Sequence, residues 1–127
     1  MDNEYVETAV RLFSQGSACS QAVLAVFGPL VGLDSGLAHR MGAGLGAGFG
    51  RKQYLCGAIS AGAIILSLKY GNADPADTIA KERASRAVRY FITAMESEFG
   101  CSDCREILGV SIETLEERQE AQRQGLF

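Results

Sequence analysis

The sequence has no surplus of positive charge, and this lack excludes one class of partner. Its 127 residues include 12 Lys and Arg against 15 Asp and Glu, which gives a formal net charge of −3 with the single histidine neutral. Proteins that condense on nucleic acid or on an anionic membrane surface do so through a basic electrostatic field. We therefore expect neither nucleic acid nor an anionic membrane surface to be a partner.

Signals for export and for membrane crossing are also missing. The first ten residues, MDNEYVETAV, are acidic where a secretory signal has a basic segment followed by an apolar run. The longest apolar run covers residues 54–68, with Arg51 and Lys52 just before it. It is shorter than the roughly 20 residues that a bilayer crossing needs. These absences predict a cytoplasmic protein that does not span a membrane.

Strand patterns, internal repeats and low-complexity segments are nearly absent, and helical periodicity fills the chain instead. With 47% hydrophobic residues, the chain is long enough for one domain with a core and too short for two. We expect residues 1–127 to form a single all-α domain, a compact bundle of about six helices. The segment of roughly residues 56–70 is apolar nearly all round, so it should lie at the centre, surrounded by other helices, with Gly71 as its left-handed stop.

Capping residues and glycines delimit the other predicted helices. The expected starts are Ser17, Asp34 or Ser35, Asp74-Pro75, Ser102 and Ser111, and the expected stops are Gly16, Gly28-Pro29 or Gly32, Gly100 and Gly109.

Glycine occupies every second position from residue 42 to residue 50. The stretch fails as a dinucleotide fingerprint because Phe49 stands where the third glycine should be, and as a Walker loop because no hydroxyl residue follows Lys52. Each glycine inside a helix costs about 1 kcal/mol relative to alanine, so we expect part of the stretch to be an irregular turn. Such a turn would expose amide N–H groups beside Cys56. Close packing alone and the shaping of a thiol pocket are both open as its role.

The four cysteines are the main candidates for chemistry, because a cytosolic chain of this size is not expected to carry a static disulfide framework. Cys19, Cys56 and Cys104 each fall in the opening turn of a predicted helix. There the positive end of the helix dipole stabilises a thiolate and lowers the pKa of a cysteine below about 8.5. Three cations that are close in sequence would act in the same direction: Arg51, Lys52 and Arg105.

The same three thiols are expected to face one another. Cys19 and Cys104 each share a helical stripe with apolar residues three and four positions later, so both should point inward. If the central helix turns Cys56 the same way, three sulfurs converge, and we take Cys56, Cys19 and Cys104 as candidate catalytic residues. The alternative for any single cysteine is that it fills a gap in the core without chemistry.

A metal site is the main alternative use of these thiols. Cys101 and Cys104 form a C-x-x-C pair, and with Cys19 and Cys56 they could ligate zinc or an iron–sulfur cluster. A single C-x-x-C does not by itself specify a zinc site. The lone His39 is expected to be a solvated or packing residue, and one histidine does not support a Ser-His-Asp arrangement.

The sequence resembles the C_GCAxxG_C_C family, small proteins with four cysteines and a Cys-Gly-Ala-x-x-Gly motif that are named for a suspected redox activity. Two departures stand out: Ala61 takes the place of the last glycine of the motif, with Gly62 next to it, and Cys101 is an extra thiol before the Cys-Arg-Glu element. The family pattern continues to a further cysteine, so either a tail is lost or Cys101 substitutes for it. The matching segments are Ala18-Cys19-Ser20-Gln21-Ala22, Gly44 to Gly50, Cys56-Gly57-Ala58, Leu68-Lys69-Tyr70-Gly71 and Cys104-Arg105-Glu106-Ile107-Leu108-Gly109.

The resemblance implies a helical protein of bacterial or archaeal origin and anaerobic habit, whose genes often accompany those of transporters. It supplies no reaction, so three functions are open. The first is thiol–disulfide redox chemistry, in which Cys56 attacks and Cys104 or Cys19 resolves. The second is metal or iron–sulfur binding. The third is a helical accessory module of a transporter that is not an enzyme and that dimerises through its fifth helix.

Overall fold

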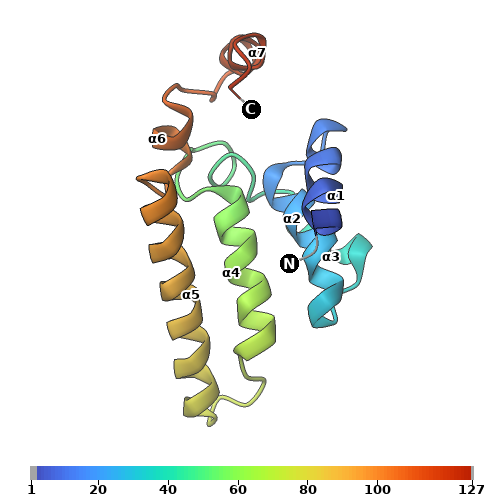
Figure 1. Cartoon of the computed structure of the whole chain (residues 1–127), viewed down its shortest axis with the longest axis vertical. Helices are drawn as coiled ribbons and strands as arrows, with labels where there is room; N and C mark the ends of the chain where they lie inside the picture. Colours follow the sequence, from blue (N-terminus) through green and yellow to red (C-terminus); the bar gives the residue numbers. More distant parts are fainter. Residues whose placement is uncertain (1–2, 127) are drawn as a thin grey trace.

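The computed structural model describes residues 3–126 and confirms the all-α fold (Figure 1). Within these residues there is no strand, only an isolated antiparallel bridge between Leu55 and Asp103. The helices are α1 (Asn3–Ser14), α2 (Cys19–Phe27), the 3₁₀ helix η1 (Gly28–Val31), α3 (Ser35–Met41), α4 (Gly57–Tyr70), α5 (Thr78–Phe99), α6 (Cys104–Leu108) and α7 (Leu115–Arg123).

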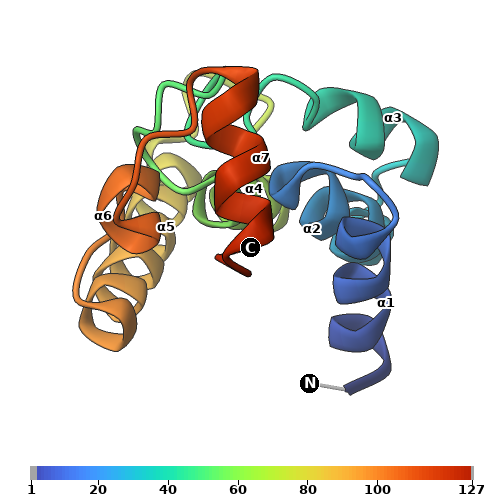
Figure 2. The same ribbon diagram turned by 90° about the horizontal axis from the view of Figure 1, so that it is seen from above.

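The α4 helix holds the bundle together. It packs against α5 on one side and α2 on the other, and α2 in turn packs against α1 and α3. Figure 1 shows α4 between α5 and the α1–α3 group, with α6 and α7 near the end where α4 begins. Figure 2, seen from above, shows the same elements gathered around that end of α4. Segments far apart in sequence therefore meet at the start of the central helix.

The core is small and centres on Leu24, Ala38 and Ala61, all completely buried. The prediction of a central apolar helix at residues 56–70 is confirmed in position, but only its first half is enclosed. Buried residues of α4 end at Ala61, residues 63–66 are half-buried, and Leu68 is exposed. Ile64 and Ile65 still pack against the core, but the last turn of α4, residues 67–69, is exposed.

Several predicted helix starts were wrong by one to four residues. Ser17 does not cap α2, since its hydroxyl pairs with His39 and the helix begins at Cys19. The start of α5 lies at Thr78 because Asp77 accepts from the Ala80 amide, whereas Asp74 is used in a local turn to the Ala76 amide. Local hydrogen bonds by these polar side chains compete with helix capping. The caps of α6 and α7 are Asp103 and Thr114 instead of Ser102 and Ser111.

Glycines end the helices mostly as expected. Gly32, Gly100 and Gly109 have positive φ and stop η1, α5 and α6. Gly71 follows α4, but with φ −77° it is not left-handed, so that prediction was wrong. Gly62, which follows Ala61 in the variant motif, lets α4 approach α5 closely: a methyl group there would lie 2.6 Å from the Phe91 ring.

Two predictions concern what the bundle contacts: that the protein does not span a membrane, and that it dimerises through its fifth helix. Among residues 3–126, no helix combines the length and the apolar character that a membrane crossing requires. A homodimer through α5 stays a prediction. The exposed side chains of Ile79 and Tyr90, 76% and 77% accessible, show that α5 carries apolar surface that its own chain leaves uncovered.

Candidate functional site: a pocket lined by three cysteines

Cys19, Cys56 and Cys104 line one pocket of about 550 Å³. Cys19 is the first residue of α2, Cys56 immediately precedes α4, and Cys104 is the first residue of α6. All four cysteines of the chain are free, partly buried thiols. The structure thus brings together the three candidate catalytic residues at the starts of three helices, while their chemical role stays a prediction.

Backbone pairing fixes Cys56 and Cys104 relative to each other. The amide of Cys56 donates to the carbonyl of Ser102 at 2.8 Å, and the amide of Cys104 donates to the carbonyl of Tyr54 at 2.6 Å. These two bonds flank the Leu55–Asp103 bridge, so Cys56 and Cys104 are diagonal neighbours across a short antiparallel pair. Two residues 48 positions apart are held side by side by the main chain.

The Cys19 sulfur lies close to the start of α4 because Gly57 has no side chain. A methyl group on Gly57 would lie 2.6 Å from the Cys19 sulfur and 3.1 Å from the Leu45 carbonyl oxygen. Only glycine leaves room there for the sulfur to rest against the first turn of α4. This contact explains the glycine in the Cys56-Gly57-Ala58 segment and places the Cys19 sulfur beside the residue that follows Cys56.

The glycine-rich stretch forms the wall of the pocket as a left-handed loop. All five residues from 47 to 51 have φ between 55° and 72°, and three of them, Ala47, Phe49 and Arg51, are not glycine. Non-glycine residues in this region cost of order 1–3 kcal/mol each and persist where the surroundings impose them. The predicted irregular turn is confirmed, and Gly46, Ala47, Gly50 and Arg51 line the thiol pocket.

The expectation that this loop exposes its amides beside Cys56 is wrong for the amides that close the loop on itself. The amides of Phe49, Gly50, Gln53 and Tyr54 donate to carbonyls within residues 44–48. The loop is therefore internally hydrogen-bonded and rigid, and its walls do not offer these N–H groups to a ligand.

The glycines also serve close packing. A methyl group on Gly42 would lie 2.8 Å from the Gln21 amide nitrogen, and one on Gly46 would lie 2.7 Å from the Ala18 β-carbon. Ser20, completely buried, donates its hydroxyl to the Gly42 carbonyl at 2.6 Å. The two roles left open for the glycines therefore both hold: they let the loop contact the start of α2, and the resulting shape lines the pocket.

Gln53 is a buried polar residue that no sequence pattern singled out. Its side-chain amide donates to the Val110 carbonyl at 2.7 Å and accepts from the Ile112 amide at 2.8 Å, and its backbone carbonyl accepts from the Arg105 amide. The side chain takes the place of a strand partner for residues 110–112. Gln53 thus ties the loop to both ends of α6, and so helps to position Cys104.

Replacing Gln53 with alanine is expected to lower the free energy of unfolding by about 3 kcal/mol, because the Ile112 amide loses its partner in a buried place and the Val110 carbonyl loses its partner in a half-buried one. Urea unfolding measures the loss. The exposed Gln119 on α7 is the control, and Gln119→Ala should stay within about 0.5 kcal/mol of the parent. Equal stability of the two variants would show that the Gln53 hydrogen bonds to Val110 and Ile112 do not stabilise the fold.

The electrostatic expectation for Cys104 was wrong. Burial raises the pKa of the Cys104 thiol from 9.0 to about 11, and the neighbouring Cys56 and Cys19 sulfurs add to the rise. The first two amides of α6 are already used by the carbonyls of Tyr54 and Gln53, so the helix start is not open to the sulfur. Cys104 is therefore a protonated thiol at neutral pH.

The pH dependence of Cys104 alkylation should report this shift. Below pH 9 the thiol stays protonated and reacts slowly with iodoacetamide, and its rate should rise toward a midpoint near pH 11. Peptide-resolved mass spectrometry of the native protein, with the denatured protein as reference, gives the profile for this one residue. A native profile with its midpoint at or below that of the denatured chain would contradict the placement of Cys104 in the pocket.

Of the three cations expected near the thiols, only one lies at the pocket. Arg51 lines the pocket, whereas Lys52 lies over the Tyr54 ring and Arg105 pairs with Glu113 at 3.7 Å. Arg118 of α7 is a pocket residue that the sequence pattern did not single out. His39 is a half-buried packing residue, as expected, held by Ser17 at 2.9 Å and by Gln21 at 3.4 Å.

Cys101 stands apart from the other three thiols, since it does not line the pocket. Its thiol contacts the Phe99 carbonyl, and burial together with Glu106 and Asp103 raises its pKa. Across residues 3–126, no group of three or more His, Cys, Asp or Glu side chains is arranged to hold a metal ion. The geometry therefore does not favour the alternative in which Cys19, Cys56, Cys101 and Cys104 ligate zinc or an iron–sulfur cluster.

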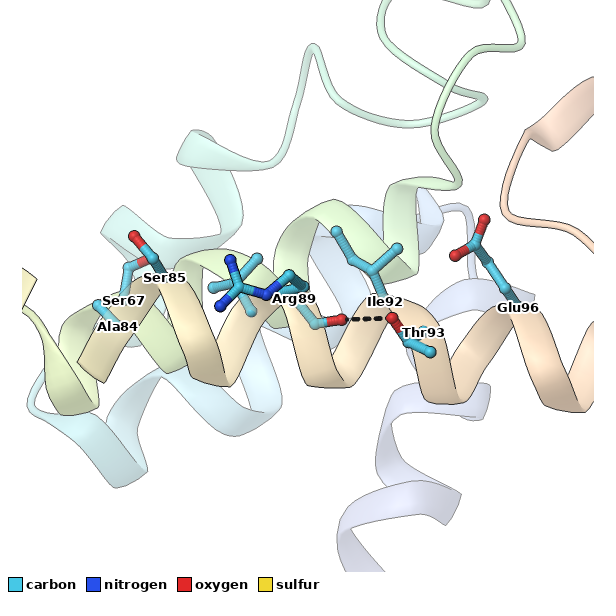
Figure 3. A pocket seen from close by; sticks show the side chains of 8 residues that line it. Ser67, Ala84, Ser85, Arg89, Ile92, Thr93 and Glu96 are labelled. Atoms are coloured by element: carbon cyan, nitrogen blue, oxygen red, sulfur yellow. Dashed lines mark hydrogen bonds between the residues drawn. The ribbon is translucent and has the colours of Figure 1, made fainter. Parts of the chain in front are cut away.

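A second pocket, about 560 Å³, lies over α5 and carries none of the predicted site residues (Figure 3). Seven of its lining residues belong to α5 and one, Ser67, to α4. Figure 3 shows Arg89 and Glu96 along its length and the bond from the Thr93 hydroxyl to the Arg89 carbonyl, 2.8 Å. The groove holds no nucleophilic thiol, so the cysteine pocket is the candidate site.

The three thiols at helix starts and the glycine loop beside them lie inside a matched region. A family model described as "Putative redox-active protein (C_GCAxxG_C_C)" matches residues 17–125, which includes every residue of the cysteine pocket except Phe13 and Gly16. The chain belongs to this family. Comparison with curated proteins and comparison with solved structures each gave no match. For this C_GCAxxG_C_C protein, the family description supports a redox role in general and names no substrate or partner.

Proposed function

We propose that this protein carries out thiol–disulfide exchange with the three cysteines of the pocket. The observation that carries the proposal is the convergence of Cys19, Cys56 and Cys104 on one cavity, fixed by backbone hydrogen bonds and by the Gly57 contact. Static structural cysteines have no need for a shared cavity. Thiols that react in pairs must approach one another and must be reachable, and a pocket provides both.

Cys56 is the attacking thiol in this proposal. It occupies the cap position of the 14-residue helix α4, and no hydrogen bond from its side chain caps that helix. The positive end of the helix dipole stabilises negative charge on a sulfur at this position. Cys104, protonated at neutral pH, is poorly suited to make the first attack.

The exchange balances without any further reagent. The Cys56 thiolate attacks one sulfur of a disulfide substrate, forms a mixed disulfide and releases the other sulfur as a thiolate, which takes up a proton. Cys19 or Cys104, after losing its own proton, then attacks the Cys56 sulfur and releases the second substrate thiol. The substrate disulfide gains two electrons and two protons, and the protein dithiol becomes a disulfide.

Both resolving thiols are compatible with the geometry. Diagonal neighbours in an antiparallel pair have α-carbons about 7–8 Å apart, and a disulfide spans about 4.4–6.8 Å, so Cys56 and Cys104 need only a small approach. Burial is the main cause of the raised pKa of Cys104 and remains, while the smaller contribution of Cys56 is lost once Cys56 is in a mixed disulfide. Cys19 lies against the residue next to Cys56.

Thiol counting under controlled potential tests the proposal. Anaerobically purified protein should lose two of its four free thiols in redox buffers around −200 to −230 mV and regain them with dithiothreitol. Metal analysis of the same sample tests the alternative in which the cysteines bind zinc or an iron–sulfur cluster. Retention of all four thiols across this range, or a stoichiometric metal that chelators remove together with the fold, would overturn the proposal.

A further inference from the structure

The charges around the cysteine pocket differ in sign from those of the whole chain. Two of the residues that line the pocket, Arg51 and Arg118, are positively charged, and none of them is Asp or Glu. The chain as a whole has a net charge of −3. The charged side chains that line the cavity are thus all positive on an acidic protein, an arrangement that favours anions over cations.

Both guanidinium groups are available to a ligand. Arg51 lies on the left-handed loop, is exposed, and makes no ion pair within residues 3–126. Arg118 is half-buried, and its Nη1 donates to the carbonyls of Ile112 and Glu113 at 3.3 and 2.9 Å, which anchors the side chain at the pocket without neutralising its charge.

Four acidic residues lie near Arg118 in sequence, Glu113, Glu116, Glu117 and Glu120, and none of them lines the cavity. The Glu113 carboxylate pairs with Arg105 at 3.7 Å. The Glu117 carboxylate accepts from the Thr114 backbone amide at 3.1 Å, and this bond together with one to Ser111 holds the pKa of Glu117 below its usual range. The Glu113 charge is thus balanced by Arg105, whereas the Glu117 carboxylate stays ionised; neither residue lines the cavity.

We propose that the pocket takes a small anionic disulfide, one that bears carboxylate groups, and presents its sulfur–sulfur bond to the pocket thiols. The inference rests on the proposed thiol–disulfide exchange and names its substrate class. A volume of about 550 Å³ suits a small molecule, and guanidinium is the side-chain group that best matches a carboxylate. The remaining walls are mostly apolar, with Ala47, Ile107 and Leu108 among them, and suit a short aliphatic chain.

The redox step is the thiol–disulfide exchange at Cys56, and the carboxylates of the substrate take no part in it. The first attack breaks the substrate disulfide and releases one carboxylate-bearing thiol, and resolution releases the second. Two electrons and two protons pass from the protein dithiol to the substrate. The carboxylates stay ionised throughout, so the arginines bind both the disulfide and the leaving thiol.

Three small disulfides that differ in charge test the assignment: dithiodiglycolate (two negative charges), bis(2-hydroxyethyl) disulfide (neutral) and cystamine (two positive charges). Each rate with the reduced protein is divided by its rate with free 2-mercaptoethanol, which removes differences in intrinsic reactivity. The normalised rate should be about tenfold higher for the anion than for the neutral probe, lower still for the cation, and the preference should shrink with added salt.

Variants locate the preference in the pocket. Arg51→Gln should remove most of the difference between the normalised rates of the anionic and the neutral probe, and Arg51→Lys should retain that difference. Arg83→Gln on α5 removes the same charge away from the cysteine pocket and should change nothing. Equal normalised rates for the three probes, or a preference that Arg51→Gln leaves intact, would overturn this inference while the exchange activity stands. Failure of all three probes to react would instead overturn the proposed function.

Discussion

Cys56→Ser is expected to abolish disulfide exchange, with the rate for a neutral disulfide falling roughly 100-fold or more, because a serine hydroxyl is not ionised at neutral pH and cannot form the mixed disulfide. The reversible loss of two thiols should disappear with it. The measurement is the release of 2-mercaptoethanol from bis(2-hydroxyethyl) disulfide by reduced protein under anaerobic conditions. The effect is large because Cys56 is the one thiol of the pocket at the positive end of a long helix.

Cys101→Ser is the matched control for this change. Cys101 lies three residues from Cys104 but does not line the pocket, so its removal should leave the exchange rate and the two-thiol oxidation unchanged. Cys19→Ser and Cys104→Ser should separate the resolving roles. The variant that lacks the resolving thiol should accumulate a mixed disulfide on Cys56. Full activity in Cys56→Ser, or loss of activity in Cys101→Ser, would refute the assignment.

Gly48→Ala is expected to cause the largest loss of stability of any single methyl addition in the loop. Gly48 is buried with φ +72°, and a methyl group there would lie 2.4 Å from the Tyr54 amide nitrogen and 2.6 Å from two Gln53 backbone atoms. These are main-chain atoms that cannot rotate away, and the Tyr54 amide is itself bonded to the Gly48 carbonyl. The loop would have to open and would release the strand-like contact that holds Cys56 beside Cys104.

Gly50→Ala separates this steric effect from backbone strain. Gly50 has φ +62°, close to that of Gly48, but no atom lies within 4 Å of a methyl group placed there. Both variants carry the left-handed penalty of about 1–2 kcal/mol, and Gly48→Ala should lose about 3 kcal/mol more or fail to fold. Urea unfolding with a far-ultraviolet circular dichroism signal compares them. Equal stability of the two alanine variants would contradict the loop geometry.

Local sequence signals predicted the helices and the convergence of thiols well, for a physical reason. Helical periodicity and left-handed glycines act within a few residues, so the central helix and the stops at Gly100 and Gly109 could be anticipated. The inward direction of Cys19 and Cys104 followed from the same stripe rule. Helix starts were less accurate because several polar residues compete for each cap, as Asp74 and Asp77 do at α5.

The parts of the site that the sequence did not predict depend on tertiary contacts. No residue preference indicates that Ala47, Phe49 and Arg51 adopt positive φ, since side chains disfavour that region and only the surrounding hydrogen bonds enforce it. Gln53 reads as a surface polar residue until its two partners 57 and 59 positions away are known. The raised pKa of Cys104 likewise follows from burial and neighbouring sulfurs, which override the local effect of a helix start.

Disulfide mapping tests the central claim most directly. The reduced protein is poised anaerobically in a glutathione buffer, alkylated, digested without reduction and analysed for linked peptides. The account predicts one intramolecular disulfide that joins Cys56 to Cys104 or to Cys19, with Cys101 alkylated as a free thiol. Four alkylated thiols at every potential, or linkage through Cys101 alone, would contradict it.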